Sequence, residues 1–570
     1  MPLPPTTPVL AKAFELHRAG RLAEAAVLYR EVLRERPRDP AALNNLGALQ
    51  LQMGAVAAAV ETLSAFVAER PDDPIGYSNL GHALIQTGRA ADAEAPLRRA
   101  VALDSGFALA HNHLGMALAV LDRPTDAAVE FSRALELEPN LVEAARNLGG
   151  TMNDSGDGQR AAAAYQTWLR VDSGNPLAKA GLALADAMQG RLVDAIDALE
   201  QLTLSRPDDA NAWQTLGMIR YWDGRLAEAH AAARRALVLQ PDSVEARFLL
   251  AGSLLGQGEY RAGWREFEQR TEGSLGETQR FPGLPRWDGQ ALPGRLLLHG
   301  EQGLGDVIQF SRFVPRAKEQ AGSVVLMLDE HWASLAPLLA SLPGVDAILT
   351  ETDQLRAADA PPIAARASIL SLPYLLGCEV ATIPNAVPYL RAPAAKAAAW
   401  ARRLAGVRSL RVGVAWAAYA RSRLRYVTLH KSVPFALVAR LFDIPGIVFV
   451  SLQKGSASKD AREAAAAGRL RDAEAELEDF GDTAALIENL DVVLTTDTSV
   501  AHVAGALGKS VWMLDRYNTC WRWRLSATAS PWYPTMRIFR QPRFGDWATV
   551  VERVAAALAE RVQARDHRER

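Results

Sequence analysis

The chain has 570 residues, which exceeds one ordinary domain and is enough for two or three separately packed cores. Hydrophobic residues make up 49% and charged residues 22%, and 63 Lys and Arg nearly balance 65 Asp and Glu, so the composition excludes general disorder and a polyanion-binding surface. The only two cysteines, Cys378 and Cys520, lie far apart, which excludes a disulfide framework and a cysteine metal cluster.

The beginning of the chain lacks the pattern of an export signal. Residues 1–20 contain no basic segment followed by an apolar core, and no later apolar run is long enough to span a bilayer. The balanced charge argues against nucleic acid as a partner. The sequence therefore predicts a cytoplasmic protein that has no membrane span and does not bind nucleic acid.

A 34-residue repeat runs through the N-terminal half. The pair Leu-Gly recurs at this spacing from Leu46-Gly47 to Leu216-Gly217, and a glycine recurs in the same register from Gly20 to Gly258, with Asp122 as the one exception. Glycine lets two helices meet at a close turn, alanine lets their axes approach, and proline ends the second helix. We expect an α solenoid over residues 6–272, with seven units up to residue 243 and a partial eighth to about residue 270.

One position just before the Leu-Gly pair is polar in several units. It falls on the first helix of each hairpin, which we expect to line the concave face, so its side chains would form a row. Asparagine donates and accepts hydrogen bonds at once and suits the backbone of a bound chain, but the same pattern fits residues that merely face water. The candidate acceptor-binding residues are Asn45, Asn79, His113 and Asn147.

The C-terminal half alternates apolar strands with helices after a Gly- and Pro-rich segment that predicts a linker over residues 273–294. Nearly continuous apolar strands separated by helices predict parallel sheets covered on both faces, and two sets of strands predict two Rossmann-like lobes, residues 295–393 and 394–566. The helical stretch 394–405 separates the two sets. The expected strands are 296–299, 324–329, 347–350 and 369–372 in the first lobe, and 411–416, 447–452, 491–495, 511–514 and 536–539 in the second.

The loops that follow such strands carry the chemistry, because ligands bind at the carboxyl ends of parallel strands. In the first loop, Gly303 and Gly305 would let the backbone approach a ligand. Asp306 lies at or near the N-cap of a helix predicted to run through Arg312, and a capping role alone would explain an aspartate there.

A second loop combines a strand end with a helix built from small residues. Asp497, Thr498 and Ser499 place hydroxyl and backbone N–H groups at a helix start, which suits a diphosphate. His502 faces back from the first turn, and a structural histidine fits that position equally well.

The third loop, residues 416–434, is rich in cations: Arg421, Arg423, Arg425 and Lys431. Such cations neutralise a leaving phosphate, although a solvated loop has the same composition.

The motifs of both halves resemble those of known protein families. The repeats resemble tetratricopeptide repeats, and their asparagine row resembles the asparagine ladder of the O-linked N-acetylglucosamine transferases. The segments "GEQGLGDVIQFSRFVP", "SVPFALVARLFDIPGIVFVSLQKG", "DTAALIENLDVVLTTDTSVAHVAGALGKSVWMLDRYNTCWRW" and "SPWYPTMRIFRQ" resemble the catalytic half of bacterial tetratricopeptide glycosyltransferases, which is related to the lipopolysaccharide heptosyltransferases. The resemblance implies a GT-B fold.

The resemblance also implies an activity: transfer of a sugar from a nucleotide-sugar donor to Ser or Thr of an acceptor protein held by the repeats. Some relatives modify flagellin in the cytoplasm, so flagellin is the candidate acceptor. By similarity Asp306 is the general base and Thr498, Ser499 and His502 form the phosphate-binding helix start. The further donor-binding candidates are Gly303, Gly305, Lys431, Gln453, Lys454 and Asp497.

No metal and no cofactor other than the nucleotide-sugar co-substrate is expected, because the catalytic half contains no Asp-x-Asp. One departure concerns the donor. Relatives have Gly soon after the Trp that ends the first strand of the second lobe, whereas this chain reads Trp416-Ala-Ala-Tyr-Ala, and the added methyl groups would narrow or reshape the donor site.

Two alternatives stay open. The C-terminal lobes could be a non-catalytic docking module of a repeat adaptor, which the altered loop after Trp416 favours. Alternatively, the transferase could act on a lipid-linked or polysaccharide acceptor, although a peptide groove has little use for a glycolipid.

Overall fold

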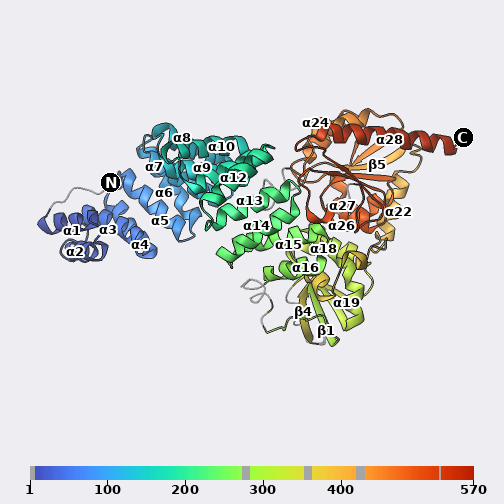
Figure 1. Cartoon of the computed structure of the whole chain (residues 1–570), viewed down its shortest axis with the longest axis horizontal. Coiled ribbons are helices and arrows are strands. Elements are labelled where there is room, and N and C mark those ends of the chain that lie inside the picture. Colours follow the sequence, from blue (N-terminus) through green and yellow to red (C-terminus); the bar gives the residue numbers. More distant parts are fainter. Residues whose placement is uncertain are drawn as a thin grey trace. The chain divides into compact units, whose positions relative to one another are not determined.

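The computed structural model describes residues 7–271, 281, 283–351, 362–418, 430–524 and 528–569. These residues form two compact units with the boundary between Leu202 and Thr203. The first unit consists of helical hairpins. The second contains the last two hairpins and two parallel sheets (Figure 1).

The first unit is a series of antiparallel helix pairs in which each of the first ten helices contacts its successor. The first helices of several pairs begin with an acidic or amide cap followed by proline. Asp39 accepts a hydrogen bond from the backbone N–H of Ala42 at 3.0 Å, and Pro40 is the first helical residue. The helices are α1 Pro8–Arg18, α2 Leu22–Glu35, α3 Pro40–Gln52, α4 Val56–Glu69, α5 Pro74–Gln86, α6 Ala90–Leu103, α7 Ala108–Val120, α8 Pro124–Leu137, α9 Val142–Ser155, α10 Gly158–Val171, α11 Pro176–Met188 and α12 Leu192–Ser205.

The repeating glycines serve two different purposes. Those in the turns have left-handed backbone angles, with φ at +72° in Gly54, and Asp122, the exception in the sequence pattern, also adopts a positive φ of +59°. The glycines of the Leu-Gly pairs allow close packing instead. A Cβ on Gly47 would lie 2.6 Å from Leu63 of the next helix. The predicted role of glycine in the turns is confirmed, whereas the close approach of the helices, predicted from alanine, depends on glycine as well.

The second unit begins with two further hairpins. These are α13 Ala210–Trp222 with α14 Leu226–Leu239, and α15 Val244–Gln257 with α16 Tyr260–Glu268. The predicted partial eighth repeat is thus a hairpin whose second helix ends at Glu268. No helix among the described residues is long and apolar enough to cross a membrane.

The first lobe, residues 283–393, contains a four-stranded parallel sheet in the order β3-β2-β1-β4. Its elements are β1 Leu292–His299, α18 Leu304–Phe310, α19 Val314–Gln320, β2 Ala321–Met327, α20 Ala336–Leu339, β3 Ala347–Leu349, β4 Ile363–Ser368 and α21 Leu372–Leu375. The strand predicted at 369–372 is wrong. Ser368 accepts a hydrogen bond from Leu370 N at 3.1 Å and starts a helical turn, so the strand is the preceding, less apolar segment.

Part of the predicted linker packs on this lobe. Trp287 is buried, its backbone N–H donates to Arg366 O at 2.8 Å, and β1 begins at Leu292 rather than at the predicted residue 296. Phe281 is buried beside Leu297 in a small core under the sheet. Residues 272–280 and 282 lie outside the described residues.

The second lobe, residues 394–569, contains a six-stranded parallel sheet in the order β10-β9-β8-β5-β6-β7. The short strand β7 was not predicted. The elements are α22 Ala394–Arg403, β5 Leu410–Ala415, α24 Phe435–Val438, β6 Ile447–Ser451, α25 Ser458–Ala466, β7 Arg471–Asp472, α26 Phe480–Glu488, β8 Val492–Thr496, α27 Ser499–Ala506, β9 Val511–Asp515, the 3-10 turn η9 Trp521–Trp523, β10 Met536–Arg540 and α28 Trp547–Glu569.

This sheet is buried on both faces, as its continuous apolar strands predict. Along β8, Val492 and Leu494 enter one core while Val493 enters the other, because successive side chains of a strand alternate. The long helix α28 runs beside α24 across the lobe (Figure 1). The opposite core extends from this sheet through the first lobe to α15 and α16, so the last repeat hairpin is packed into the same body.

A turn glycine and a glycine inside a helix of the first unit differ in a way that unfolding can measure. Neither Gly54 nor Gly150 has an atom within 4 Å of a built Cβ, but only Gly54 has a positive φ. Gly54→Ala should lower the free energy of unfolding by about 1 kcal/mol, because an L side chain strains the left-handed backbone. Gly150→Ala, inside α9, should raise it by about 0.5 kcal/mol. Urea unfolding of both variants tests this; equal effects would contradict the assignment.

Candidate functional site

The strand orders place one switch point in each sheet. In the first lobe the chain leaves β1 toward β2 but returns to the other side of β1 as β4, and in the second lobe β6 and β8 flank β5. Parallel sheets bind ligands outside the carboxyl ends of strands at such points. The loops concerned begin at Gly300, after Ala415 and at Asp497. The first loop and the last carry the acidic and hydroxyl residues that the sequence singled out.

The loop after β1 holds Asp306 in a defined position. Gln302 has a positive φ of +57°, which is strained for a residue with a side chain. Gly303 is the N-cap of α18, and its N–H donates to Asp306 Oδ2 at 3.0 Å. Asp306 is therefore near the N-cap, as predicted, but it is the third residue of the helix and not the N-cap itself. The α-helix ends at Phe310 and not at Arg312. The Asp306 carboxylate accepts the capping hydrogen bond that the sequence allowed.

The start of α27 lies at the end of β8. Thr498 is its N-cap, and the Thr498 hydroxyl lies 3.1 Å from the Thr495 hydroxyl rather than capping the helix itself. Asp497, whose side chain is 11% exposed, forms an ion pair with Lys431, whose Nζ is 2.8 Å from Oδ2. Burial alone raises the pKa of Asp497, but the charge and hydrogen bond of Lys431 outweigh it and hold that pKa below its ordinary value. The structure thus brings Lys431 to the helix start, paired with an acid.

The two lobes meet where α18 packs against α27. A Cβ on Gly305 would lie 2.8 Å from His502 Cδ2 and 3.5 Å from Ser499 Cα. Gly305 therefore allows the approach of two helices, and not the predicted approach of a backbone to a ligand. Asp306 follows Gly305 directly, so the predicted juxtaposition of this acid with the second lobe's helix start is present in the structure.

His502 occupies a structural position in this contact. Its ring is buried, and Nδ1 is 2.9 Å from the Tyr533 hydroxyl. Burial chiefly lowers the pKa of His502 to about 3, with the charge of Arg522 adding to the effect and that of Asp497 opposing it. The imidazole is neutral at physiological pH, so it is a packing and hydrogen-bonding residue rather than a cation for a phosphate.

Arg522, which the sequence analysis missed, joins the two lobes at this point. It lies on η9, its Nη2 is ion-paired with Asp306 Oδ1, and its Nε donates to Gln309 Oε1 at 2.6 Å. Burial alone lowers the pKa of Arg522, but Asp306 and further negative neighbours raise it above its ordinary value. The signal available in the sequence was an arginine between two tryptophans in the loop after β9.

Two predicted donor contacts are engaged within the protein. Gln453 Oε1 accepts from the backbone N–H groups of Trp416 and Ala417 at 3.0 and 2.9 Å, and its amide nitrogen donates to Ala417 O and Lys454 O. The Lys454 ammonium donates to the Leu477 carbonyl. Gln453 therefore fixes the loop after β5. The cations predicted at Arg421, Arg423 and Arg425 lie outside the described residues.

The predicted acceptor row, all in the first unit, is largely buried. Asn45 is 1% and His113 is 5% exposed, and His113 Nδ1 is 2.9 Å from the Ser78 hydroxyl. Asn79 and Asn147 are half-buried, and the Asn147 amide donates to Asn112 at 3.0 Å. These contacts hold neighbouring repeats together. Asn79 and Asn147 are the two members of the row with exposed surface.

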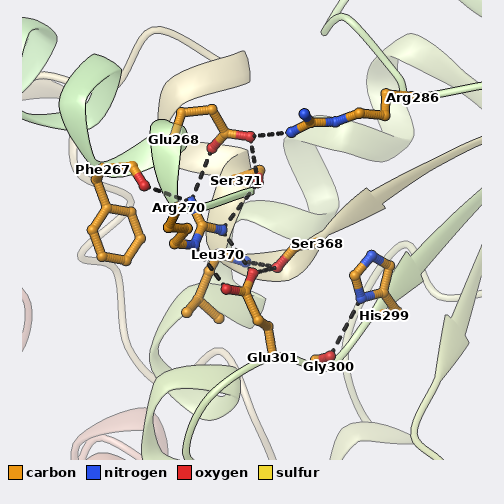
Figure 2. A network of polar contacts seen from close by, with 10 residues as sticks. All are labelled: Phe267, Glu268, Arg270, Arg286, His299, Gly300, Glu301, Ser368, Leu370 and Ser371. Atoms are coloured by element: carbon orange, nitrogen blue, oxygen red, sulfur yellow. Dashed lines mark hydrogen bonds and ion pairs between the residues drawn. The ribbon is translucent and has the colours of Figure 1, made fainter. Parts of the chain in front are cut away.

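A second network missed from sequence lies beside the first loop (Figure 2). Arg270, which follows α16, binds both carboxylate oxygens of Glu301 at 2.8 and 2.7 Å and also contacts Glu268. Glu301 further accepts a hydrogen bond from Ser368 at the end of β4. Burial alone raises the pKa of Glu301, but the bonds and charge of Arg270 outweigh it and lower that pKa. The network ties the end of the last repeat to the strained loop before Asp306.

Within the described part of the chain, no group of three or more His, Cys, Asp or Glu side chains is placed to hold a metal ion. The polar groups that do converge on the candidate site are two ion pairs, Asp306 with Arg522 and Asp497 with Lys431.

Comparison with known proteins bears on the repeats first. Two models described as tetratricopeptide repeat match the chain, one at residues 16–81 and 152–219 and the other at 78–142 and 215–270. The matched ranges extend from α1 to the end of α16. This part of the chain consists of tetratricopeptide repeats.

A curated relative extends further along the chain. Protein FlbA of Caulobacter vibrioides is 30% identical over 380 residues, which cover 63% of this chain. The chain in turn spans 63% of the length of that relative. The similarity is to a protein whose name states no activity.

Solved structures resemble the chain over the repeats. The Cut9-Hcn1 assembly of the APC/C is 18% identical, covers 43% of this chain and 48% of its own, and has a TM-score of 0.36. A tetratricopeptide repeat protein from Parabacteroides merdae is 16% identical with coverages of 43% and 97% and a TM-score of 0.35. YrrB, a repeat protein with an unusual peptide-binding site, is 22% identical with coverages of 33% and 96% and a TM-score of 0.29. Scores this low support no inference about function.

The contact between α18 and α27 should not tolerate a methyl group. Gly305→Ala is expected to lower the free energy of unfolding by about 2 kcal/mol, because the His502 ring is held by Tyr533 and cannot move freely. Gly252→Ala, in α15, is the control, since its Cβ would meet only Tyr221 at 3.5 Å. Thermal unfolding of both variants checks this, and equal stability of the two would argue against close packing at Gly305.

The Arg270–Glu301 pair should contribute stability that depends on pH. Glu301→Gln is expected to cost about 3 kcal/mol at neutral pH, because it leaves Arg270 buried with one carboxylate fewer. Since the pKa of Glu301 is lowered by folding, the ionised pair stabilises the fold above the ordinary carboxyl value, and this stability is lost as the pH falls through the folded value.

The measurement is the melting temperature of the wild type and of Glu301→Gln between pH 7 and pH 3. The difference in melting temperature between the two proteins should shrink as the pH falls below about 4.5. A difference that stays constant with pH would refute the ionic origin of this stability. Glu463→Gln, which removes an exposed partner of Lys459, should cause no measurable change at any pH.

Proposed function

We propose that the chain is a protein O-glycosyltransferase that moves a sugar from a nucleotide-sugar donor to a Ser or Thr hydroxyl of an acceptor protein. One observation carries the proposal. The helix that bears Asp306, at the switch point of one parallel sheet, packs directly against the start of α27, at the switch point of the other. A carboxylate and an anion-compatible helix start thus lie side by side, as transfer from a diphosphate requires. We take the two lobes to be a GT-B fold.

The residues present suit a single displacement. Asp306 accepts the proton of the acceptor hydroxyl while the hydroxyl oxygen forms a bond to the anomeric carbon of the sugar. The bond from that carbon to the diphosphate oxygen breaks, and its electron pair leaves with the nucleoside diphosphate. The positive end of α27, together with Lys431, stabilises the charge that develops on the departing phosphate.

The repeats supply the protein partner in this proposal. Stacked helical hairpins present an extended surface that suits a polypeptide better than a small molecule. Flagellin is the candidate acceptor. Asn79 and Asn147 are the ladder residues with surface left for a bound chain, whereas Asn45 is buried and His113 contacts Ser78 of the preceding repeat.

A second function, a non-catalytic repeat adaptor, is favoured by a specific observation. Three residues expected to contact a donor each bind a group of the protein itself: Lys431, Gln453 and Lys454. A degenerate donor site with its cations neutralised would retain these contacts. The intact corner at Asp306 argues against this reading, because a docking module does not need a buried ion pair between its lobes.

Release of nucleotide from purified protein tests the proposal. Incubation with UDP-, GDP- and CMP-linked sugars and an acceptor protein such as flagellin should release nucleotide with one of them, and mass spectrometry should find a glycan on the acceptor. Asp306→Asn should lower the rate at least 100-fold, because the general base is lost. No release and no thermal shift with any donor would support the adaptor instead.

Asp482→Asn is the matched control for Asp306→Asn. Asp482 is also the third residue of a helix, α26, and its carboxylate accepts a hydrogen bond from the N-cap, Asp479, at 3.2 Å. The change removes a helix-capping carboxylate of the same kind outside the proposed site. If both variants lost activity equally, a capping role would suffice for Asp306.

A further inference from the structure

The polar contacts of Arg522 connect the second lobe to the helix that carries Asp306. Arg522 belongs to the second lobe, yet both of its polar contacts described above are on one helix of the first lobe: Nη2 with Asp306 and Nε with Gln309, at 2.6 Å. Its guanidinium also stacks on Trp521 at 4.5 Å and Phe310 at 5.8 Å. The side chain is 15% exposed, so water competes little for these bonds.

We infer that Arg522 is the positioning residue for Asp306, holding its carboxylate in one orientation for proton abstraction. This inference rests on the proposed function. A guanidinium is planar and presents donors in a fixed fork, so bonds to residues three apart on a helix fix the rotation of the group they bind. Gly303 N–H holds the other carboxylate oxygen at 3.0 Å. Both oxygens of Asp306 are therefore held, and each retains a lone pair to accept a proton.

The last repeats hold Arg522 in place. Two residues further on, Arg524 donates to the Tyr221 carbonyl of α13 and stacks on the Tyr221 ring at 4.4 Å. Trp521 packs edge-on against Trp264 of α16 and Trp532, with centroids 5.3 and 5.9 Å apart. The segment that carries Arg522 is thus anchored on the C-terminal repeats, and these repeats support the reacting carboxylate through it.

Several other ionisable groups lie around the pair of Asp306 and Arg522. Five of these groups interact electrostatically within this cluster: Asp497 after β8, Lys431 in the loop after β5, His502 on α27, Cys520 before η9 and Arg312 on the 3-10 turn after α18. Asp497 and Lys431 neutralise each other as an ion pair, and His502 is neutral. The Tyr389 hydroxyl and the carbonyls of Gln309 and Trp532 accept hydrogen bonds from Arg312. Arg522 is the cation directly bonded to Asp306.

Variants at Arg522 separate positioning from donor binding. With the donor that the wild type uses, Arg522→Gln should lower kcat about 100-fold and leave the donor KM within about twofold, because the loss concerns the orientation of the base. Arg522→Lys keeps the charge but loses the fork, so it should restore part of kcat. A raised donor KM with unchanged kcat would show instead that Arg522 binds the donor, and would overturn the inference.

Two further variants guard against misfolding and general charge loss. Gln309→Met removes the second bond of Arg522 but keeps its ion pair, and should lower kcat about tenfold without changing the donor KM. Arg537→Gln removes an exposed guanidinium that stacks on Phe539 at 4.5 Å, and should change neither quantity. If the wild type releases nucleotide but Arg522→Gln matches it, this inference alone fails; if the wild type releases none, the proposed function fails with it.

Discussion

The close approach of α18 and α27 at Gly305 is the constraint on which the rest of the candidate site depends. Only a residue without a Cβ lets the two helices come together over His502, and this contact brings Asp306 within reach of the second lobe. The contact is a packing requirement with a chemical consequence. Because Asp306 follows Gly305 directly, the separation of the lobes and the position of the carboxylate are set by the same contact.

Two partly buried ion pairs then hold the corner from opposite sides. Arg270 of the repeat end binds Glu301, and Arg522 of the second lobe binds Asp306, while Gln302 between them adopts a strained left-handed backbone. Buried ion pairs are weak sources of net stability, because desolvation offsets much of their attraction. Their value here is specificity: they select one conformation of a short loop that would otherwise have several.

Repeats and lobes are joined more closely than their sequence patterns suggest. The C-terminal hairpin shares a hydrophobic core with the first lobe, and Arg270 and Arg524 carry polar contacts from this region into the two lobes. The described chain accordingly divides within the repeats, at residue 202, and not at the Gly- and Pro-rich segment. A period of 34 residues reports how each hairpin folds, but it carries no information on which hairpin packs against the next domain.

The sequence by itself determined the local structure. The spacing of Gly, Ala and Pro specified the hairpins, and continuous apolar runs specified all but two of the strands described, because these features depend on backbone angles and side-chain alternation along the chain. The tertiary structure decided the roles of single residues. Gly305 allows a helix contact, His502 is a neutral packing residue, and Gln453 holds a loop in place. Arg522 binds Asp306, 216 residues away, and Glu301 binds Arg270, 31 residues away. Such pairings have no signature in a single sequence, since they arise when segments distant along the chain are brought together by folding.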